Sequence, residues 1–308
     1  MNIPARWAYL AVFVGVCGHA SSEFFAVLSG VSGPEVSVWR YMIGSAGLLL
    51  WALATPATRD LWSPLREDWR RLVPLALIGV SGAYLAFHWA LDFATVIQVA
   101  TVVTTMPIFV GLINLVVNGE RIGTVKLVTG AMAVIGVVLL LTDGAVDTLA
   151  AGGDELWGVL LAVICAVLGS GYAVLAKPFM TKHGGMKITT LALLIGAVGL
   201  YVVVGLGWGR WVNPVELGDF PAVAFWSLLA LAVLNTTITQ VLWFGGLAAA
   251  PDITRASYLF FLKPVIAAVL AVFILAQDPT LLQGLAILVV TGSVLVEMFW
   301  TRLAAARA

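Results

Sequence analysis

Long apolar runs follow one another along the whole chain, and they constrain the fold more than any other feature. Each helical crossing of a bilayer core takes about 20 mostly apolar residues. Runs of this kind, bounded by charged or Gly/Pro-containing segments, predict ten transmembrane helices. The predicted crossings are residues 7–29, 35–54, 72–91, 95–117, 124–142, 156–176, 187–207, 221–244, 252–275 and 281–301.

The composition leads to the same fold class. The 308 residues are 61% hydrophobic and only 10% charged, which is too few charges to cover a water-soluble surface. Backbone groups in lipid must be hydrogen-bonded internally, and runs of this length exclude the short alternating strands of a barrel. We therefore expect an all-α integral membrane protein. The first run is too long for a signal-peptide core and is expected to remain as a helix.

The distribution of basic residues predicts the orientation, because cytoplasmic loops retain Lys and Arg. Thirteen of the sixteen Lys and Arg residues fall on one side of the ten crossings, and Arg210 alone falls on the other. The remaining two, Arg40 and Lys263, lie inside predicted helices. Both termini are thus expected to be cytoplasmic.

Two segments in opposite halves of the chain share a pattern of a proline, an apolar helix and a polar end. They are "TTMPIFVGLINLVVNGERIG" and "FLKPVIAAVLAVFILAQDPT", in which Pro107 and Pro264 are 157 residues apart. A duplicated unit of five helices explains this offset and predicts two repeats, residues 1–152 and 153–308. Since five is odd, the second copy would cross the membrane in the opposite direction, giving an inverted-topology repeat.

These segments, together with "VWRYMIG" and "YLAFHWALDFA", resemble the ten-helix EamA-type carriers of the drug/metabolite transporter superfamily. The family pattern has a Glu after both proline helices; here the first is Glu120, and Gln277 followed by Asp278 stands at the second. The resemblance implies export of metabolites such as amino acids by alternating access, in the inner membrane of a bacterium. Within the family, the chain looks most like the YddG-type aromatic amino acid exporters.

Ionisable side chains inside membrane helices are costly and are candidate functional groups. His19, Ser22 and Glu23 share one face of the first helix. Glu23 could form an ion pair with Arg40, or could exchange a proton for a substrate; small multidrug carriers of the same superfamily look similar in having a Glu in this helix. Lys263 could bind a substrate carboxylate, pair with Glu23 or extend to the membrane interface.

Polar side chains on other helices complete the candidate site. Tyr84 and His88 lie one turn apart and could hold a ligand by a hydrogen bond and a ring stack, or His88 could simply pair with another helix. Threonine hydroxyls near a helix proline often bond their own backbone instead. Amides in lipid must meet other helices or water. The further candidates for substrate binding are Gln98, Thr101, Tyr172, Asn235, Gln240 and Tyr258.

The favoured function is an exporter of amino acids or similar metabolites, with a central cavity. The alternative is a proton-coupled exporter of cationic drugs that uses Glu23 for both proton and substrate. The chain has no P-loop, GxSxG elbow, His/Cys metal cluster or filter loop, so neither an enzyme nor a channel is indicated, and no cofactor or metal is expected. Cys17 and Cys165 are expected to be inert thiols. Zero net charge argues against nucleic acid as a partner.

Overall fold

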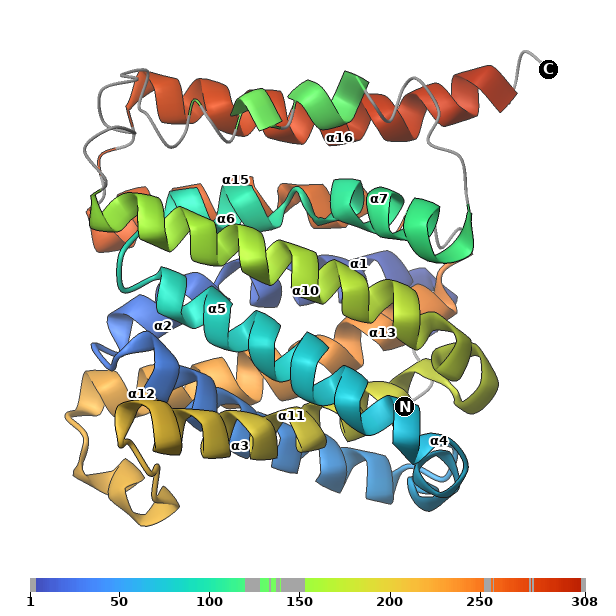
Figure 1. The fold of residues 1–308 in the computed structure, drawn as a ribbon, viewed down its shortest axis with the longest axis vertical. Helices are drawn as coiled ribbons and strands as arrows, with labels where there is room; N and C mark the ends of the chain where they lie inside the picture. The colour runs from blue at the N-terminus through green and yellow to red at the C-terminus, as the bar shows by residue number, and fades with distance from the viewer. Residues whose placement is uncertain are drawn as a thin grey trace.

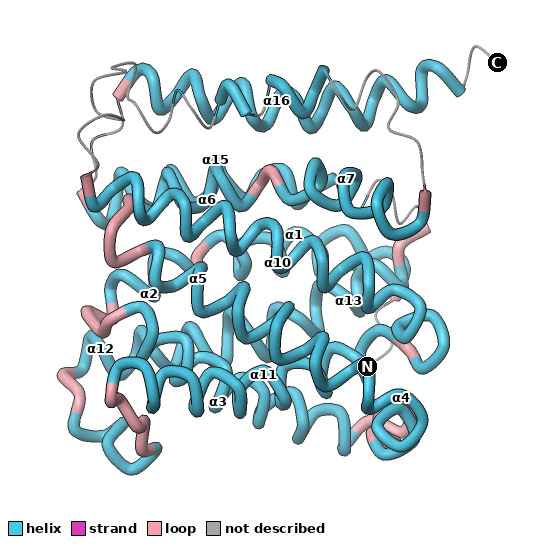
Figure 2. The backbone as a smooth tube through the Cα atoms, viewed as in Figure 1, coloured by secondary structure: helices cyan, strands magenta, loops and turns pink. Residues whose placement is uncertain are grey.

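The protein is described by a computed structural model that covers residues 4–119, 128–132, 134–136, 139, 153–251, 256, 258–276, 278 and 280–305. Within these residues every regular element is a helix (Figure 1). Figure 2 shows that short loops join the helices. The expected all-α class of membrane protein is confirmed.

The helices of the amino-terminal half run from the first residues described to Asn118. Several crossings consist of two or three successive helical segments. They are η1 (Ala5–Trp7), α1 (Ala8–Ala20), α2 (Ser22–Leu28), α3 (Gly33–Ala54), α4 (Trp62–Leu75), η2 (Ala76–Gly82), α5 (Ala83–Ala90), α6 (Val96–Val103) and α7 (Met106–Asn118).

The carboxy-terminal half begins with the longest helix. Its elements are α10 (Asp154–His183), α11 (Gly185–Trp208), η3 (Pro214–Asp219), α12 (Ala222–Leu229), η4 (Ala230–Ile238), α13 (Thr239–Ala249), η5 (Tyr258–Leu262), α15 (Lys263–Leu275) and α16 (Leu281–Ala305).

Seven helical stretches among the described residues are long and apolar enough to cross a membrane. Two shorter apolar helices, Val265–Leu275 and Leu281–Ser293, follow at the end of the chain. About half of the fifth predicted crossing, residues 124–142, lies outside the described residues, and so do Glu120 and Gln277. The seven long stretches are Ala5–Leu28, Gly33–Ala54, Trp62–Ala90, Val96–Asn118, Asp154–His183, Gly185–Trp208 and Ala222–Leu247.

The predicted start of the third crossing is wrong. We expected a helix over residues 72–91, whereas the helical stretch begins ten residues earlier, at Trp62. Charged residues such as Arg66 and Arg70 end the apolar run, but they are good helix formers and do not end the helix. Hydropathy therefore located the edge of the apolar segment and not the end of the helix.

The helices of the two halves are interleaved. Helices of the first half pack against helices of the second: α1 packs against α13, and α5 packs against α10. The helix α3 contacts both α11 and η4, and α11 also contacts η2. Close approach of α1 and α13 depends on Gly246, where an added Cβ would lie only 3.0 Å from the carbonyl oxygen of Ala8. The largest hydrophobic core spans both halves and includes Trp39, Leu48 and Leu228.

Two helical stretches, one in each half of the chain, share local irregularities. Trp62–Ala90 contains the π-helix η2, and Ala222–Leu247 contains the π-helix η4. The helices α7 and α15 each have a proline in the first turn and 13 residues. Each ends at a residue in the left-handed conformation, Gly119 after α7 and Ala276 after α15.

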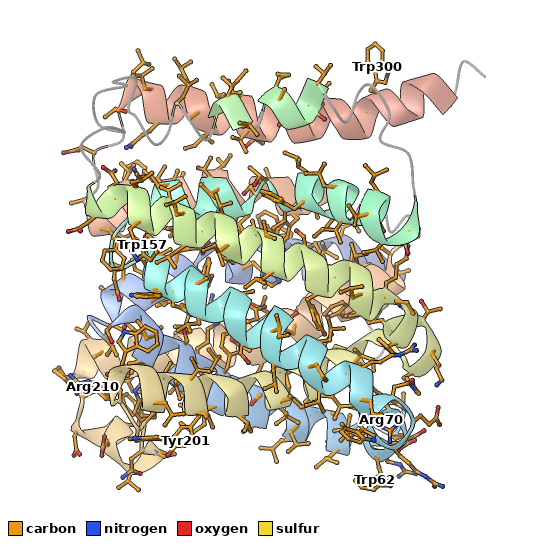
Figure 3. The ribbon with its side chains drawn as sticks, viewed as in Figure 1. Trp62, Arg70, Trp157, Tyr201, Arg210 and Trp300 are labelled. Atoms are coloured by element: carbon orange, nitrogen blue, oxygen red, sulfur yellow. The ribbon has the colours of Figure 1, made fainter. Side chains whose placement is uncertain are left out.

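Aromatic and basic side chains mark the two ends of the helical bundle. Figure 3 shows Trp62 and Arg70 at one end, whereas Trp157 and Arg210 lie at the opposite end. All four of these side chains, Trp62, Arg70, Trp157 and Arg210, are exposed. Exposed tryptophans at both ends are typical of the two interfaces of a membrane protein.

The left-handed residue at the end of α15 gives a direct test of the backbone geometry. Ala276 has φ of 52°, a conformation that favours glycine. We expect Ala276→Gly to raise the free energy of unfolding by roughly 1 kcal/mol. The matched change Gly119→Ala should lower it by a similar amount, because a Cβ there meets no atom within 4 Å and adds backbone strain alone. Thermal unfolding in detergent measures both; shifts of the same sign would contradict the assignment.

Candidate functional site

A buried ion pair joins the two halves of the chain. Lys263 Nζ, at the start of α15, lies 2.7 Å from Glu23 Oε1 on α2. Glu23 is fully buried and Lys263 is 5% exposed. The Ser22 hydroxyl donates a hydrogen bond to the other carboxylate oxygen of Glu23, at 2.8 Å. The sequence left Arg40 and Lys263 as possible partners of Glu23. The structure shows the pair with Lys263, and the expected pair with Arg40 does not form.

Arg40 instead binds neutral groups on α5 and η4, because its side chain on α3 faces these elements. Its Nε donates to the Thr236 hydroxyl at 3.0 Å, and its Nη2 donates to the Asn235 carbonyl at 3.4 Å. Its Nη1 lies 3.2 Å from Nε2 of His88. Arg40 is only 4% exposed, so these contacts replace water around a buried cation.

The contact with Arg40 determines the protonation of His88. A guanidinium can only donate, so His88 Nε2 must accept and carries no proton. The proton of a neutral imidazole then sits on Nδ1, which donates to the Tyr84 carbonyl at 2.9 Å. The Ser37 hydroxyl also lies 2.9 Å from this nitrogen. His88 is therefore a neutral link between α3 and α5.

Aromatic rings surround the cationic groups. The Tyr41 and Tyr84 rings lie 4.2 Å apart, and the Arg40 guanidinium is 5.2 Å and 5.9 Å from their centroids. Lys263 Nζ lies 5.4 Å from the centroid of the Phe87 ring. Such cation–π contacts stabilise desolvated cations by about 2 kcal/mol or more each.

His19 belongs to a second aromatic group beside the ion pair. Its ring lies 5.8 Å from that of Trp243 and 5.5 Å from that of Phe260, and the latter two rings are 5.3 Å apart. These residues come from α1, α13 and η5. The face of the first helix that carries His19 and Glu23 thus points into the protein, as the sequence predicted.

Asn235 and Tyr172 occupy neighbouring buried positions. The Asn235 amide donates to the Gly18 carbonyl and, at 2.8 Å, to the Ser21 hydroxyl, which fixes η4 against α1. The Tyr172 hydroxyl is buried and has no hydrogen-bond partner among the described residues. Sequence analysis proposed both residues, and both lie in the protein interior.

Two of the predicted site residues have local roles in α6. The Gln98 carbonyl oxygen accepts from the Thr95 backbone N–H at 2.8 Å, forming a capping box, and its amide group donates to Glu155. The Thr101 hydroxyl donates to the Ile97 carbonyl at 2.7 Å. The Thr101 hydroxyl thus bonds the backbone of its own helix, which is the alternative that the sequence left open for threonine near a helix proline.

The other two predicted residues are Gln240 and Tyr258. Gln240 is partly exposed on α13, one turn beyond the Thr236 that binds Arg40. The side chain of Tyr258 lies outside the part of the structure that is described.

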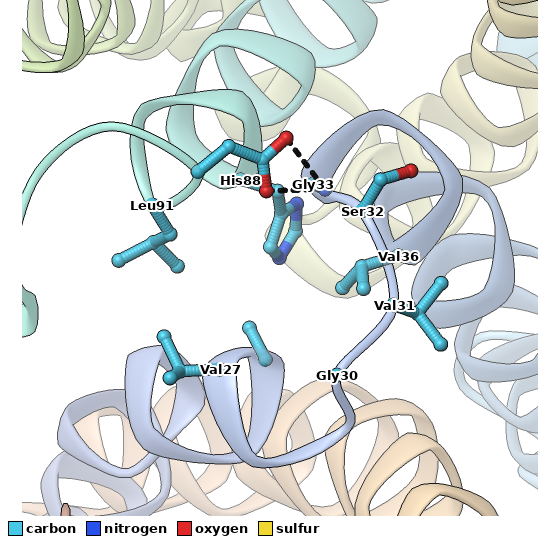
Figure 4. A pocket seen from close by; sticks show the side chains of 10 residues that line it. Val27, Gly30, Val31, Ser32, Gly33, Val36, His88 and Leu91 are labelled. Atoms are coloured by element: carbon cyan, nitrogen blue, oxygen red, sulfur yellow. Dashed lines mark hydrogen bonds between the residues drawn. The ribbon is translucent and has the colours of Figure 1, made fainter. Parts of the chain in front are cut away.

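A pocket of about 380 Å³ lies at the end of α2, α3 and α5. Figure 4 shows His88 at its inner wall, between Leu91 and Gly33. The carboxylate of Asp92 at its rim accepts from the Gly33 backbone N–H at 2.8 Å, capping α3. Desolvation raises the pKa of Asp92, and this hydrogen bond opposes the shift. Its lining is Ala26, Val27, Gly30, Val31, Ser32, Gly33, Val36, His88, Leu91 and Asp92.

A charged cluster links α4 to α10 at the other end of the bundle. Lys182 Nζ lies 2.9 Å from Glu67 and 2.8 Å from Asp68, and His183 Nε2 lies 2.7 Å from Asp68. The two carboxylates and His183 have the spacing of metal ligands. The Lys182 ammonium, however, already supplies the positive charge that a metal ion would bring.

Sequence reasoning considered Arg40 only as a counter-ion of Glu23 and did not include it among the candidate site residues. Arg40 and Lys263 both lie inside predicted helices, and the carboxylate of Glu23 pairs with only one of them.

We expect the Glu23–Lys263 pair to show strong coupling in a double-mutant cycle. Glu23→Gln and Lys263→Met each leave one buried charge uncompensated, and each should lower the free energy of unfolding by about 3–5 kcal/mol. The double variant removes both charges and should be more stable than either single variant. Thermal unfolding in detergent measures the cycle, and additive effects of the two changes would show that the pair is not coupled.

Relatives of the chain are found among curated transporters. It is 26% identical to an uncharacterized transporter of Archaeoglobus fulgidus, over 80% of each chain. It is 26% identical to the uncharacterized transporter YyaM of Bacillus subtilis, over 88% of this chain and 85% of that protein. A probable terminal-alkyne amino-acid exporter of Streptantibioticus cattleyicolor is 23% identical over 84% of this chain and 82% of its own length.

The fold has a counterpart among solved structures. One crystal structure superimposes with a TM-score of 0.65 at 21% identity, covering 96% of this chain and 98% of the other. The EamA-like transporter family matches twice, over residues 6–142 and 156–298. Together these two segments account for most of the sequence, and the chain belongs to the EamA-like transporter family.

Proposed function

We propose that this protein is a secondary transporter that exports amino acids or similar small metabolites from the cytoplasm of a bacterium. The observation that carries the proposal is the buried polar cluster, since it draws on both halves of the chain. Glu23, Arg40 and His88 come from the first half, and Asn235 and Lys263 from the second. A site between two halves can be exposed to one side and then the other when the halves move.

The proposed mechanism is alternating access between two inverted repeats, residues 1–152 and 153–308. The two separate family matches support a duplicated unit. The contacts support it as well, because α1 with α13 corresponds to α10 with α5, and α3 with η4 corresponds to α11 with η2. In this mechanism the chain crosses the inner membrane ten times, and both of its termini lie in the cytoplasm.

The surroundings of the cluster favour neutral or aromatic amino acids over cationic drugs. Tyr84, His19, Trp243 and Phe260 provide rings beside the charged groups. Glu23, which a cationic drug would need, is already paired with Lys263. The relative named as an amino-acid exporter gives independent support.

Transport by purified protein in proteoliposomes tests this proposal. We expect uptake of radiolabelled neutral or aromatic amino acids above that of empty liposomes, and no uptake of cationic dyes. The assay is run with and without a pH gradient to determine whether protons are coupled. Transport of dyes without transport of any amino acid would reverse the order of the two candidate functions.

Substitution at the aromatic side of the cluster tests the site. Because Tyr84 and His88 both contact Arg40 and His88 also lines the pocket, Tyr84→Ala and His88→Ala should each reduce the initial rate of transport by at least about tenfold. His183→Ala, at the far end of the bundle, serves as the control and should transport normally. If both cluster variants transport at the normal rate while remaining folded, the site lies elsewhere.

A further inference from the structure

The buried charges of the central cluster do not balance. Among the described residues, Glu23, Arg40 and Lys263 are the buried side chains with a full charge. Glu23 and Lys263 form an ion pair at 2.7 Å and neutralise each other. Arg40 has no carboxylate within 4.0 Å among the described residues, so the cluster carries one excess positive charge.

The present partners of Arg40 solvate its charge without neutralising it. They are the Thr236 hydroxyl, the Asn235 carbonyl and a neutral His88 nitrogen. A guanidinium has five N–H donors, and these three contacts leave two of them without a partner among the described residues. An uncompensated cation in a membrane interior is costly, and an anion bound beside it would remove most of this cost.

The geometry provides an approach to Arg40. His88 lines the 380 Å³ pocket, and its Nε2 is 3.2 Å from the guanidinium. One side chain thus contacts both the pocket and the cation. The Tyr172 hydroxyl is buried and has no hydrogen-bond partner among the described residues, so it can donate to an incoming oxygen.

We propose that Arg40 binds the carboxylate of the substrate, and that the carrier therefore selects small molecules with one free carboxylate. This inference rests on the proposed export function and adds the group that the site recognises. The planar fork of a guanidinium matches the two oxygens of a carboxylate. Lys263 does not take this role, since Glu23 already occupies its ammonium group.

Paired substrates test the proposal. In proteoliposomes, an amino acid that the wild-type protein transports is compared with its amide, which lacks the carboxylate. We expect wild-type protein to prefer the acid by about tenfold or more. Arg40→Gln should lose most of this preference, and Arg40→Lys, which keeps the charge but not the fork, should retain part of it. The control Arg210→Gln changes an exposed arginine at the outer end and should behave as wild type.

A binding measurement covers the case in which an Arg40 variant fails to fold. The thermal unfolding of the wild-type protein in detergent is followed with the acid and with the amide, and only the acid should raise the midpoint. Equal transport and equal stabilisation by both compounds would overturn the role of Arg40 and leave the export function intact. A wild-type protein that transports no amino acid would overturn the proposed function, and this inference with it.

Discussion

A charge in the interior of a membrane is costly unless charged or polar groups of the protein surround it, and this constraint organises the centre of the structure. Water and ions are not available there, so removing either member of an ion pair costs several kcal/mol. Glu23 and Lys263 meet this requirement across the two halves of the chain. The pair fixes α2 against α15, and the crossings around it are arranged so that both side chains reach each other.

The same constraint explains why so many uncharged polar groups gather around Arg40. Its charge is spread over a hydroxyl, a backbone carbonyl and an imidazole, and two tyrosine rings lie close to it. The hydroxyl and the imidazole are held by further hydrogen bonds, from Thr236 to the Leu231 carbonyl and from His88 to the Tyr84 carbonyl. The result is a polar network within an apolar bundle, positioned before any ligand arrives.

Much of the fold could be predicted from the sequence, because apolar runs of membrane length leave few alternatives to helices. The inward face with His19 and Glu23 followed from their spacing. The partner of Glu23 did not, since Arg40 and Lys263 were equally basic and only the packing of α15 decides between them. The role of Gln98 was likewise hidden, because a capping residue and a site residue both appear as a buried amide in an apolar run.

The π-helices η2 and η4 interrupt the helical stretches Trp62–Ala90 and Ala222–Leu247, and η4 belongs to this cluster. A π segment accommodates an extra residue per turn, and one residue corresponds to a rotation of about 100° around a helix. If the π segment moved along the helix, each residue that it passed would rotate to a different face of the helix, while both ends of the helix stayed in place. Asn235 and Thr236, which hold Gly18 and Arg40, lie within η4. Such a shift within one helical stretch would break the hydrogen bonds of η4 to Arg40 while the rest of the helical bundle stays folded.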